Sequence, residues 1–150
     1  MQNFKKNLIT IITVVKNSAP TIEKSIKSVM NQNYDKIEHI IIDGKSNDGT
    51  IEILKKYKNK INKIVIQHDK GIWDAMNKGV EIANGDIIGF LNADDYYNPD
   101  ALYLVNKYFI NNKIDFLFGS VKKYKLIHGF KPWKIKWSFG FYSSHSVGFF

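Results

Sequence analysis

The chain has 150 residues, which is enough for about one domain with a sizeable hydrophobic core. A content of 44% hydrophobic and 14% aromatic residues argues against a disordered chain, and the absence of cysteine excludes disulfides and thiolate metal sites. The formal charge of +8 predicts attraction to anions, but all 22 basic residues are lysine, which disfavours nucleic acid because guanine is read mostly by arginine.

The N-terminal stretch has two interpretations. Lys5 and Lys6, followed by the apolar run Leu8–Val15, resemble the basic and apolar parts of a signal peptide. The run is short and rich in β-branched residues, and no A-x-A site follows it, so we favour a buried first strand. No stretch approaches the roughly 18 apolar residues of a membrane span. We therefore expect a cytoplasmic protein, with the inner face of the membrane as an alternative location.

Strands and helices then alternate along the chain. Pro20 is expected to open a helix, because the apolar residues after it recur at the spacing of one helix face. A second strand covers Ile37–Ile42, and the loop GKSNDGT leads into a second helix, which Ser46, Asp48 or Thr50 can cap. The apolar positions of these two helices are Ile22, Ile26, Val29, Met30, Ile51, Leu54 and Tyr57.

The same alternation continues to about residue 112. Lys63–His68 is predicted as a third strand and Asp86–Leu91 as a fourth, each followed by a helix, the later one opened by Pro99; Ile114–Val121 is predicted as a fifth strand. Connections of this length imply crossovers between parallel strands, with helices on both faces. The sequence therefore predicts an α/β, three-layer sandwich with a mostly parallel central sheet. The apolar positions of these two helices are Ile72, Ala75, Met76, Gly79, Val80, Leu102, Val105 and Phe109.

The composition changes from Gly119 onward. This tail contains six lysines, no acidic residue and many aromatic residues, and it ends abruptly on VGFF, so we expect a portion of a longer chain. We favour a strand pair with a basic edge, followed closely by contact with an anionic membrane surface, and nucleic acid is least favoured. A lysine-rich composition is also what an AT-rich genome produces.

Polar side chains collect where the predicted strands end. In an open α/β sheet, ligands lie beyond the carboxyl ends of the strands, so these residues form the candidate site. Each could instead cap the following helix, an explanation that is as good as a functional one for Asp48 but weaker for Asp43, Asp94 and Asp95 together. The residues at the four strand ends are Thr13, Lys16, Asn17, Asp43, Asp69, Lys70, Asn92, Asp94 and Asp95.

Two of these strand ends allow a chemical interpretation. The loop GKSNDGT lacks the spacing of a P-loop or a dinucleotide fingerprint, but Asp43 before it can accept hydrogen bonds from a base or ribose. Asp94 and Asp95 repel each other, and Mn²⁺ or Mg²⁺ held between them and the phosphates of a substrate would relieve this repulsion. From the dipeptide alone, a surface turn before Pro99 is the better explanation.

A resemblance to a known family rests on four motifs taken in order. The chain resembles the family 2 glycosyltransferases of the GT-A fold in ITIITVVKNS, IIIDGKSNDGT, DKGIWDAMNKGVEIANGDIIGFLNADD and NPDAL, over roughly residues 8–105. The resemblance implies a Rossmann-like GT-A sandwich, a nucleotide-diphospho-sugar donor that is most often a UDP-sugar, a divalent metal, and transfer with inversion. It also implies a nucleotide-sugar-binding part at 1–118 and the start of an acceptor-side region at 119–150, in the same domain.

The resemblance assigns a role to most candidate residues. The end of the first strand and Asp43 match positions that hold the nucleoside, and Asp69 matches one near the base. Asp94 and Asp95 look like the carboxylates for the ribose and the metal, and Asp74 and Asn77 like residues of the donor pocket. The residues assigned to the donor are Thr13, Val14, Lys16, Asn17, Asp43, Asp69, Asp74, Asn77, Asn92 and Asp94, and those assigned to the metal are Asp94 and Asp95.

The chain also departs from the family pattern. Asn92 stands where many members have an aspartate, and Lys16 where an aromatic residue that stacks on the base is common. The sequence after Asp115 contains no carboxylate side chain, so the aspartate that members use as general base has no counterpart. His145 is a weak candidate for that base, and we favour a structural or acceptor-side role for it. His39, His68 and His128 are read as ordinary polar positions.

Three functions therefore remain open. The chain is a glycosyltransferase acting on a saccharide or lipid-linked acceptor, a truncated module that binds donor and metal without transfer, or a basic protein that binds a membrane surface or nucleic acid on a GT-A scaffold. We favour the enzyme.

Overall fold

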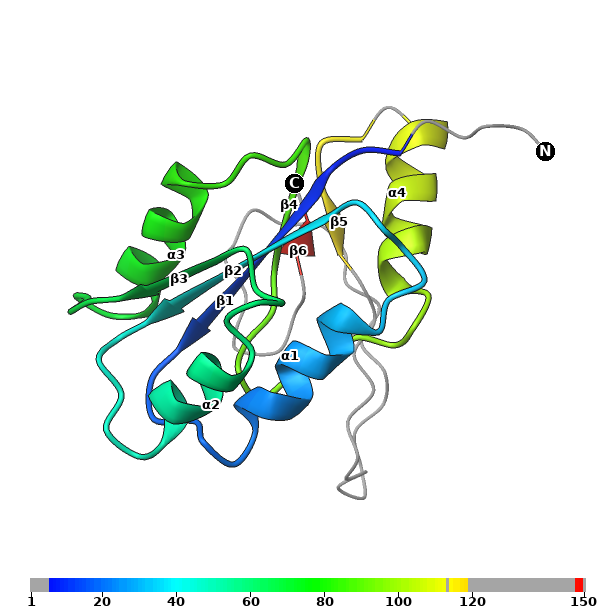
Figure 1. Ribbon diagram of the computed structural model, residues 1–150. Helices are drawn as coiled ribbons and strands as arrows, with labels where there is room; N and C mark the ends of the chain where they lie inside the picture. Colours follow the sequence, from blue (N-terminus) through cyan, green and yellow to red (C-terminus); the bar gives the residue numbers. More distant parts are fainter. Residues whose placement is uncertain (1–5, 113, 119–147, 150) are drawn as a thin grey trace, which may run out of the picture.

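The computed structural model describes residues 6–112, 114–118 and 148–149 (Figure 1). Strands and helices alternate from the first strand to the fourth helix, as predicted. The elements are β1 (Ile9–Val15), α1 (Ile22–Met30), β2 (Ile37–Asp43), α2 (Thr50–Lys56), β3 (Lys63–Ile66), α3 (Ile72–Glu81), β4 (Ile87–Phe90), α4 (Ala101–Asn111), β5 (Leu117–Phe118) and β6 (Gly148–Phe149).

The sheet has the strand order β3-β2-β1-β4-β6-β5. The four strands from β1 to β4 run parallel, and β6 pairs antiparallel with both β4 and β5, so the sheet is mostly parallel as predicted. The predicted fifth strand, Ile114–Val121, begins too early, because β5 starts only at Leu117 and covers Leu117–Phe118. Its predicted end lies outside the described residues.

Helices cover both faces of the sheet, which makes three layers (Figure 1). Every residue of β1 is buried because its side chains alternate between two apolar layers. Ile9, Ile11 and Val15 face the layer that contains α1, α2 and α4, whereas Ile12 and Val14 face α3. The predicted three-layer sandwich is therefore confirmed.

Some helix details differ from the sequence expectation. Helices α1 and α4 begin two residues after Pro20 and Pro99, and α2 ends at Lys56, so that Tyr57 only caps it. Met30, predicted on the apolar face of α1, is 41% exposed. The buried positions of α1 are instead Ile22, Ser25, Ile26 and Val29, and the Ser25 hydroxyl bonds to the loop after β4.

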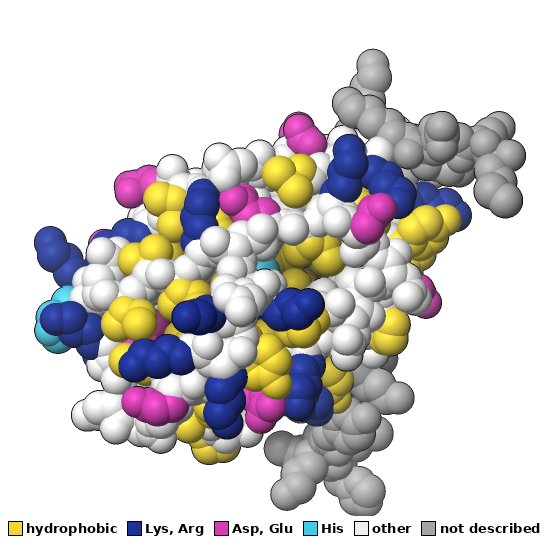
Figure 2. Space-filling model, in the orientation of Figure 1, with side chains coloured by type: hydrophobic (Ala, Val, Ile, Leu, Met, Phe, Trp, Pro, Cys, Tyr) yellow, Lys and Arg dark blue, Asp and Glu magenta, His cyan; other side chains and the backbone are white. Residues whose placement is uncertain are grey.

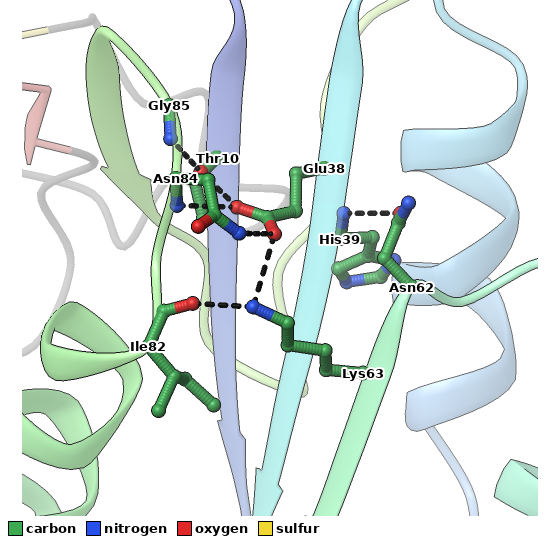
Figure 3. Close-up of polar contacts among 8 residues, drawn as sticks. All are labelled: Thr10, Glu38, His39, Asn62, Lys63, Ile82, Asn84 and Gly85. Atoms are coloured by element: carbon green, nitrogen blue, oxygen red, sulfur yellow. Dashed lines mark hydrogen bonds and ion pairs between the residues drawn. The ribbon is translucent and has the colours of Figure 1, made fainter.

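The amino end of the sheet is tied together by a buried polar network (Figure 3). The Glu38 carboxylate accepts hydrogen bonds from the Thr10 hydroxyl at 2.6 Å and from the backbone and side-chain N–H groups of Asn84 at 2.8 and 2.6 Å. Lys63 Nζ lies 3.3 Å from the same carboxylate and also donates to the Ile82 carbonyl. Burial alone raises the pKa of Glu38, but these hydrogen bonds outweigh it and lower the pKa overall.

Candidate functional site

The carboxyl ends of β1 to β4 meet at one edge of the sheet. Helix α1 leads from β1 to its neighbour β2 on one side, whereas β4 lies on the other side of β1, so the connections change direction between β1 and β4. Open α/β sheets bind ligands at such a switch point. The loops that follow the four strands therefore form the candidate site.

Asp43 is fully buried at the end of β2 and holds the following loop. Its carboxylate accepts the Ser46 backbone N–H at 2.8 Å and the Ser46 hydroxyl at 2.7 Å. The Ser46 hydroxyl in turn accepts the Asn17 backbone N–H at 2.8 Å. Asp43 thus fixes the β2–α2 loop and, through Ser46, the residue at the end of β1.

The loops after β1 and β2 are joined by reciprocal hydrogen bonds. The Asn17 side-chain oxygen accepts the Asn47 N–H at 2.9 Å. The Asp48 carboxylate accepts the Ala19 N–H at 2.9 Å and the Thr50 hydroxyl at 2.6 Å, and these bonds, led by the one from Thr50, lower the pKa of Asp48. Asp48 therefore has a structural role that links two loops and does more than cap α2, whose N-cap residue is Gly49.

Asp69 and Lys16 both approach Gly44. A Cβ atom built on Gly44 would overlap Asp69 Oδ2 and lie 3.2 Å from Lys16 Cδ. The structure thus brings together the side chains that follow β1 and β3, over a glycine that follows β2. Any larger residue at position 44 would force the Asp69 carboxylate to move, because that carboxylate comes so close to the backbone. The side chains of an acidic and a basic residue consequently meet at the same point of the carboxyl edge.

The start of α3 is arranged around two aspartates. Asp69 Oδ1 accepts the Gly71 N–H at 2.9 Å, which turns the chain into the helix. The Asp74 carboxylate accepts the Lys70 N–H at 2.9 Å and pairs with Lys78 Nζ at 2.8 Å. The Lys78 contact is the largest of the causes that lower the pKa of Asp74. Asp74 is therefore engaged within its own helix, while Asn77 is exposed one turn after Trp73.

The acidic loop follows β4 beside the end of β1, since Ala93 packs in the same buried cluster as Val15. Asp94 is exposed and Asp95 is half-buried. The Asn92 side-chain amide donates to Asp95 Oδ2 at 3.3 Å, a long bond that occupies one oxygen weakly. Asparagine at 92 therefore supports Asp95, where a carboxylate at this position would repel it.

Thr13 and Val14, although predicted to contact the nucleoside, are buried within the sheet. Thr13 has no exposed surface, and its hydroxyl lies 3.0 Å from Nε2 of the buried His39 on β2. Burial lowers the pKa of His39 to about 4, which keeps the ring neutral. Any influence of the Thr13 side chain on a ligand would be indirect, whereas Lys16 and Asn17 are exposed at the strand end.

The chemistry of the acidic loop fits a hard divalent cation. Magnesium and manganese are usually held by one or two carboxylates, with phosphate oxygens and water completing the shell. Asp94 and Asp95 supply two carboxylates of this kind. Among residues 6–112, 114–118 and 148–149, no group of three or more His, Cys, Asp or Glu side chains could hold a metal ion, so a cage built by protein alone does not fit.

The positive charge is distributed unevenly along the sequence. The described residues contain equal numbers of lysines and carboxylates, so the net +8 comes from Lys5, Lys113 and the lysines of the 119–150 tail. Figure 2 shows one face on which lysines alternate with acidic and apolar side chains. No helix in the described part of the chain is long and apolar enough to cross a membrane. His145 and the tail lie outside the described residues.

Comparison with known proteins identifies the family. The sequence model of the Glycosyl transferase family 2 matches residues 10–147. The chain belongs to glycosyl transferase family 2. Within this family it is 35% identical, over 105 residues, to the putative teichuronic acid biosynthesis glycosyltransferase TuaG of Bacillus subtilis; the match covers 68% of this chain and 41% of TuaG.

A second relative is similar over a comparable span. The UDP-Glc:alpha-D-GlcNAc-diphosphoundecaprenol beta-1,3-glucosyltransferase WfgD of Escherichia coli is 31% identical over 114 residues, which are 75% of this chain and 45% of WfgD. The chain thus spans less than half the length of these two curated relatives.

Solved structures of glycosyltransferases share the fold of this family 2 chain, which is a GT-A fold. S. aureus TarS 1-349 in complex with UDP-GlcNAc superposes with a TM-score of 0.68 at 25% identity, covering 72% of this chain and 32% of the TarS 1-349 chain. The mannosyltransferase PcManGT from Pyrobaculum calidifontis, in complex with GDP-Man and Mn²⁺, gives 0.60 at 26% identity, covering 68% of this chain and 31% of PcManGT.

Some residues that build the site were not singled out from the sequence. Ser46 was considered only as a helix cap, yet it connects Asp43 with Asn17. Its signal is its position three residues after a buried aspartate, where side chain and backbone can both bond to the carboxylate. Ser25 of α1 gives a similar signal, since a serine at 25 interrupts the apolar face of the helix.

Proposed function

We propose that this chain is the donor-binding part of a metal-assisted, inverting glycosyltransferase that takes a UDP-sugar. The observation that carries the proposal is the convergence of Lys16, Gly44 and Asp69 at the ends of three neighbouring strands, with the Asp94–Asp95 loop next to the end of β1. WfgD, named for UDP-Glc, and TarS, solved with UDP-GlcNAc, favour uridine, while PcManGT with GDP-Man provides the alternative nucleotide.

The two halves of the edge would contact different parts of the donor. The nucleoside would lie over the joined loops that contain Asn17, Asp43 and Asp69, whose hydrogen bonds fix their position before the donor arrives. The exposed Lys16 ammonium would attract the diphosphate. Asp94 and Asp95 would hold Mn²⁺ or Mg²⁺. When bound, that cation supplies positive charge against the negative charge that develops on the departing diphosphate.

Inversion requires an acceptor hydroxyl on the face of the sugar opposite the diphosphate. Its oxygen forms the new bond to the anomeric carbon while the bond from that carbon to the diphosphate oxygen breaks. The hydroxyl proton goes to a base within hydrogen-bond reach. His145 remains a weak candidate for this base, because the sequence after Asp115 has no carboxylate. We propose that the acceptor is a saccharide or a lipid-linked saccharide. The name of WfgD includes a lipid-linked saccharide, GlcNAc-diphosphoundecaprenol.

Calorimetric titration with UDP, with and without Mn²⁺, tests donor binding. We expect Mn²⁺ to tighten UDP binding and Asp95→Ala to remove about tenfold or more of that gain, because a carboxylate that holds the cation is lost. Asp35→Ala is the matched control, since Asp35 is exposed before β2 and pairs only with Lys6 in the described part of the chain. Failure of the wild-type chain to bind UDP or GDP under either condition contradicts the proposal.

Transfer from a UDP-sugar to a saccharide or undecaprenyl-linked acceptor separates an enzyme from a binding module. Binding without transfer supports the second candidate function, a donor-binding module. The lysine-rich tail motivates one more measurement, cosedimentation with anionic vesicles and with an oligonucleotide. Salt-sensitive association with vesicles that is indifferent to Asp95→Ala supports a membrane contact at the cytoplasmic face.

A further inference from the structure

The loop that contains Asp94 and Asp95 is attached to α1 on both sides of the acid pair. On one side, the Ser25 hydroxyl donates to the Asn92 carbonyl oxygen at 3.4 Å. On the other side, the Tyr97 backbone N–H donates to the Ser28 hydroxyl at 3.1 Å. The two serines lie one turn apart on the same face of the helix. The acid pair is thus bracketed by two side chains of one rigid element.

Beyond the acid pair, the attachment continues to the start of α4. The Gln32 side-chain amide donates to the Asn98 carbonyl at 2.7 Å, and its oxygen accepts the Leu102 N–H at 3.0 Å. The Asn33 N–H donates to the Pro99 carbonyl at 2.8 Å. Buried polar side chains are costly unless they are paired, and Gln32 is only 9% exposed. Gln32 and Asn33, which directly follow α1, are therefore buried or bonded as part of the same attachment to the loop.

Ser28 is the best-defined of these attachments. Its hydroxyl donates to the Ser25 carbonyl at 2.7 Å, which directs its lone pairs outward to accept the Tyr97 N–H. Tyr97 is itself anchored, because its ring is buried and its hydroxyl lies 3.4 Å from the Phe90 carbonyl. Between these points, the Lys24 ammonium lies 3.4 Å from the centre of the Tyr96 ring. The segment from Asp94 to Tyr96 has little freedom to shift.

We infer that Ser28 is a positioning residue for the acid pair, which sets where Asp95 lies relative to the donor diphosphate. The inference rests on the proposed function. Ser28 is not among the residues assigned to the donor or the cation, and it would act through the Tyr97 backbone, two residues after Asp95. The loops that would hold the nucleoside are fixed separately by Asp43 and Ser46. Loss of the Ser28 hydroxyl should therefore affect only the metal-dependent part of donor binding.

Ser28→Ala and Ser46→Ala form a matched pair, each removing one hydroxyl on a different side of the site. UDP affinity is measured by calorimetry with and without Mn²⁺. For Ser28→Ala we expect about a tenfold loss with Mn²⁺ and a change within about twofold without it, as for other residues that orient a metal ligand. Ser46→Ala should weaken UDP binding under both conditions. Ser28→Thr, which keeps the hydroxyl, should restore the affinity measured with Mn²⁺.

Amide hydrogen exchange provides a readout that needs neither metal nor nucleotide. Ser28→Ala should accelerate exchange at residues 94–97 and leave β1 unchanged, because only the loop loses an anchor. Unchanged exchange in this loop overturns the inference, as does an equal loss of UDP affinity with and without Mn²⁺. If wild-type protein shows metal-dependent UDP binding and Ser28→Ala matches it, only this inference fails. If wild-type protein binds no nucleotide, the proposed function fails as well.

Discussion

At the amino end of the sheet, the Glu38 carboxylate is surrounded by donors from Thr10, Lys63 and Asn84 (Figure 3), whereas at the carboxyl end Asp94 is exposed and bonds to no residue that the structure describes. Both ends contain an acid close to a strand terminus. The difference is the number of acceptor sites still open to a ligand. An acid whose acceptor sites are filled holds strands together, and an acid with open sites can bind a cation.

The backbone conformation also differs between the two ends of the sheet. All residues with positive φ in the described part of the chain lie in loops at the carboxyl end: Asn17, Lys45, Gly49 and Gly71. Such conformations are unfavourable for residues other than glycine and persist where surrounding contacts enforce them. Here the contacts are those of the joined loops, such as the Asn17 bonds to Ser46 and Asn47. Left-handed backbone, which strains Asn17 and Lys45, is thus found at the carboxyl end of the sheet in the described part of the chain.

The largest effect is expected from Glu38→Gln at the amino end. The amide keeps the shape of the side chain but removes its charge and points N–H groups at the donors of Thr10 and Asn84, so we expect a loss of about 3 kcal/mol in the free energy of unfolding. Urea denaturation measures it. The control is Asp35→Asn, an exposed partner of Lys6, for which we expect no measurable loss. Equal midpoints for both variants would contradict the structural role of Glu38.

His39, which lies between the two ends, should make stability depend on pH. Its pKa of about 4 in the folded protein lies below the usual value of about 6.5 for unfolded chains, so the unfolded state binds the extra proton. His39 therefore leaves the free energy of unfolding intact above about pH 6.5 and lowers it progressively as the pH falls toward 4. Between pH 7 and pH 5 we expect wild-type protein to lose about 2 kcal/mol more than His39→Gln in urea denaturation. Parallel curves for the two proteins would show that burial of the ring does not control its protonation.

Most of the fold could be predicted because its signals are local. β-branched runs and apolar residues at helical spacing each lie within one element, and they predicted the order of strands and helices from β1 to α4. The helix of Met30 shows the limit of this approach. Helical periodicity predicts that Met30 is buried and gives no reason to bury Ser25. A buried serine is explained only by its contact with the Asn92 carbonyl, 67 residues away.

The site was predictable as a set of strand ends but not as a set of contacts. Asp48 was equally explained as a helix cap, and its bond to the Ala19 N–H joins two loops 29 residues apart. Pairing of β1 with β2 places the Thr13 hydroxyl against His39, and the assignment of Thr13 to the nucleoside stays a prediction. Both outcomes depend on how neighbouring strands align, which no single stretch of sequence contains. The roles of Asp43, Asp69, Asp94 and Asp95 toward a donor stay predictions.

At the carboxyl end, Gly44→Ala should weaken donor binding. The added Cβ would occupy the space of Asp69 Oδ2 and displace a carboxylate that the Gly71 N–H holds in place, so we expect about a tenfold loss of UDP affinity, or about 1.4 kcal/mol. A double-mutant cycle with Asp69→Ala checks the route of the effect. If Gly44→Ala costs as much in the Asp69→Ala background as in wild type, then it does not act through Asp69.

The smallest effect is expected where the strain itself is relieved. Lys45 has φ of 58°, a left-handed conformation that glycine adopts without penalty, so Lys45→Gly should raise the free energy of unfolding by about 0.5–1 kcal/mol despite the greater freedom of glycine in the unfolded chain. Lys55→Gly within α2 is the control and should lower it by a similar amount, because glycine disfavours a helix. UDP affinity should change by less than about twofold, since Asp43 still holds the loop through Ser46. A stabilised variant with much weaker UDP binding would mean that the strained backbone, and not the hydrogen bonds alone, shapes the carboxyl end for its ligand.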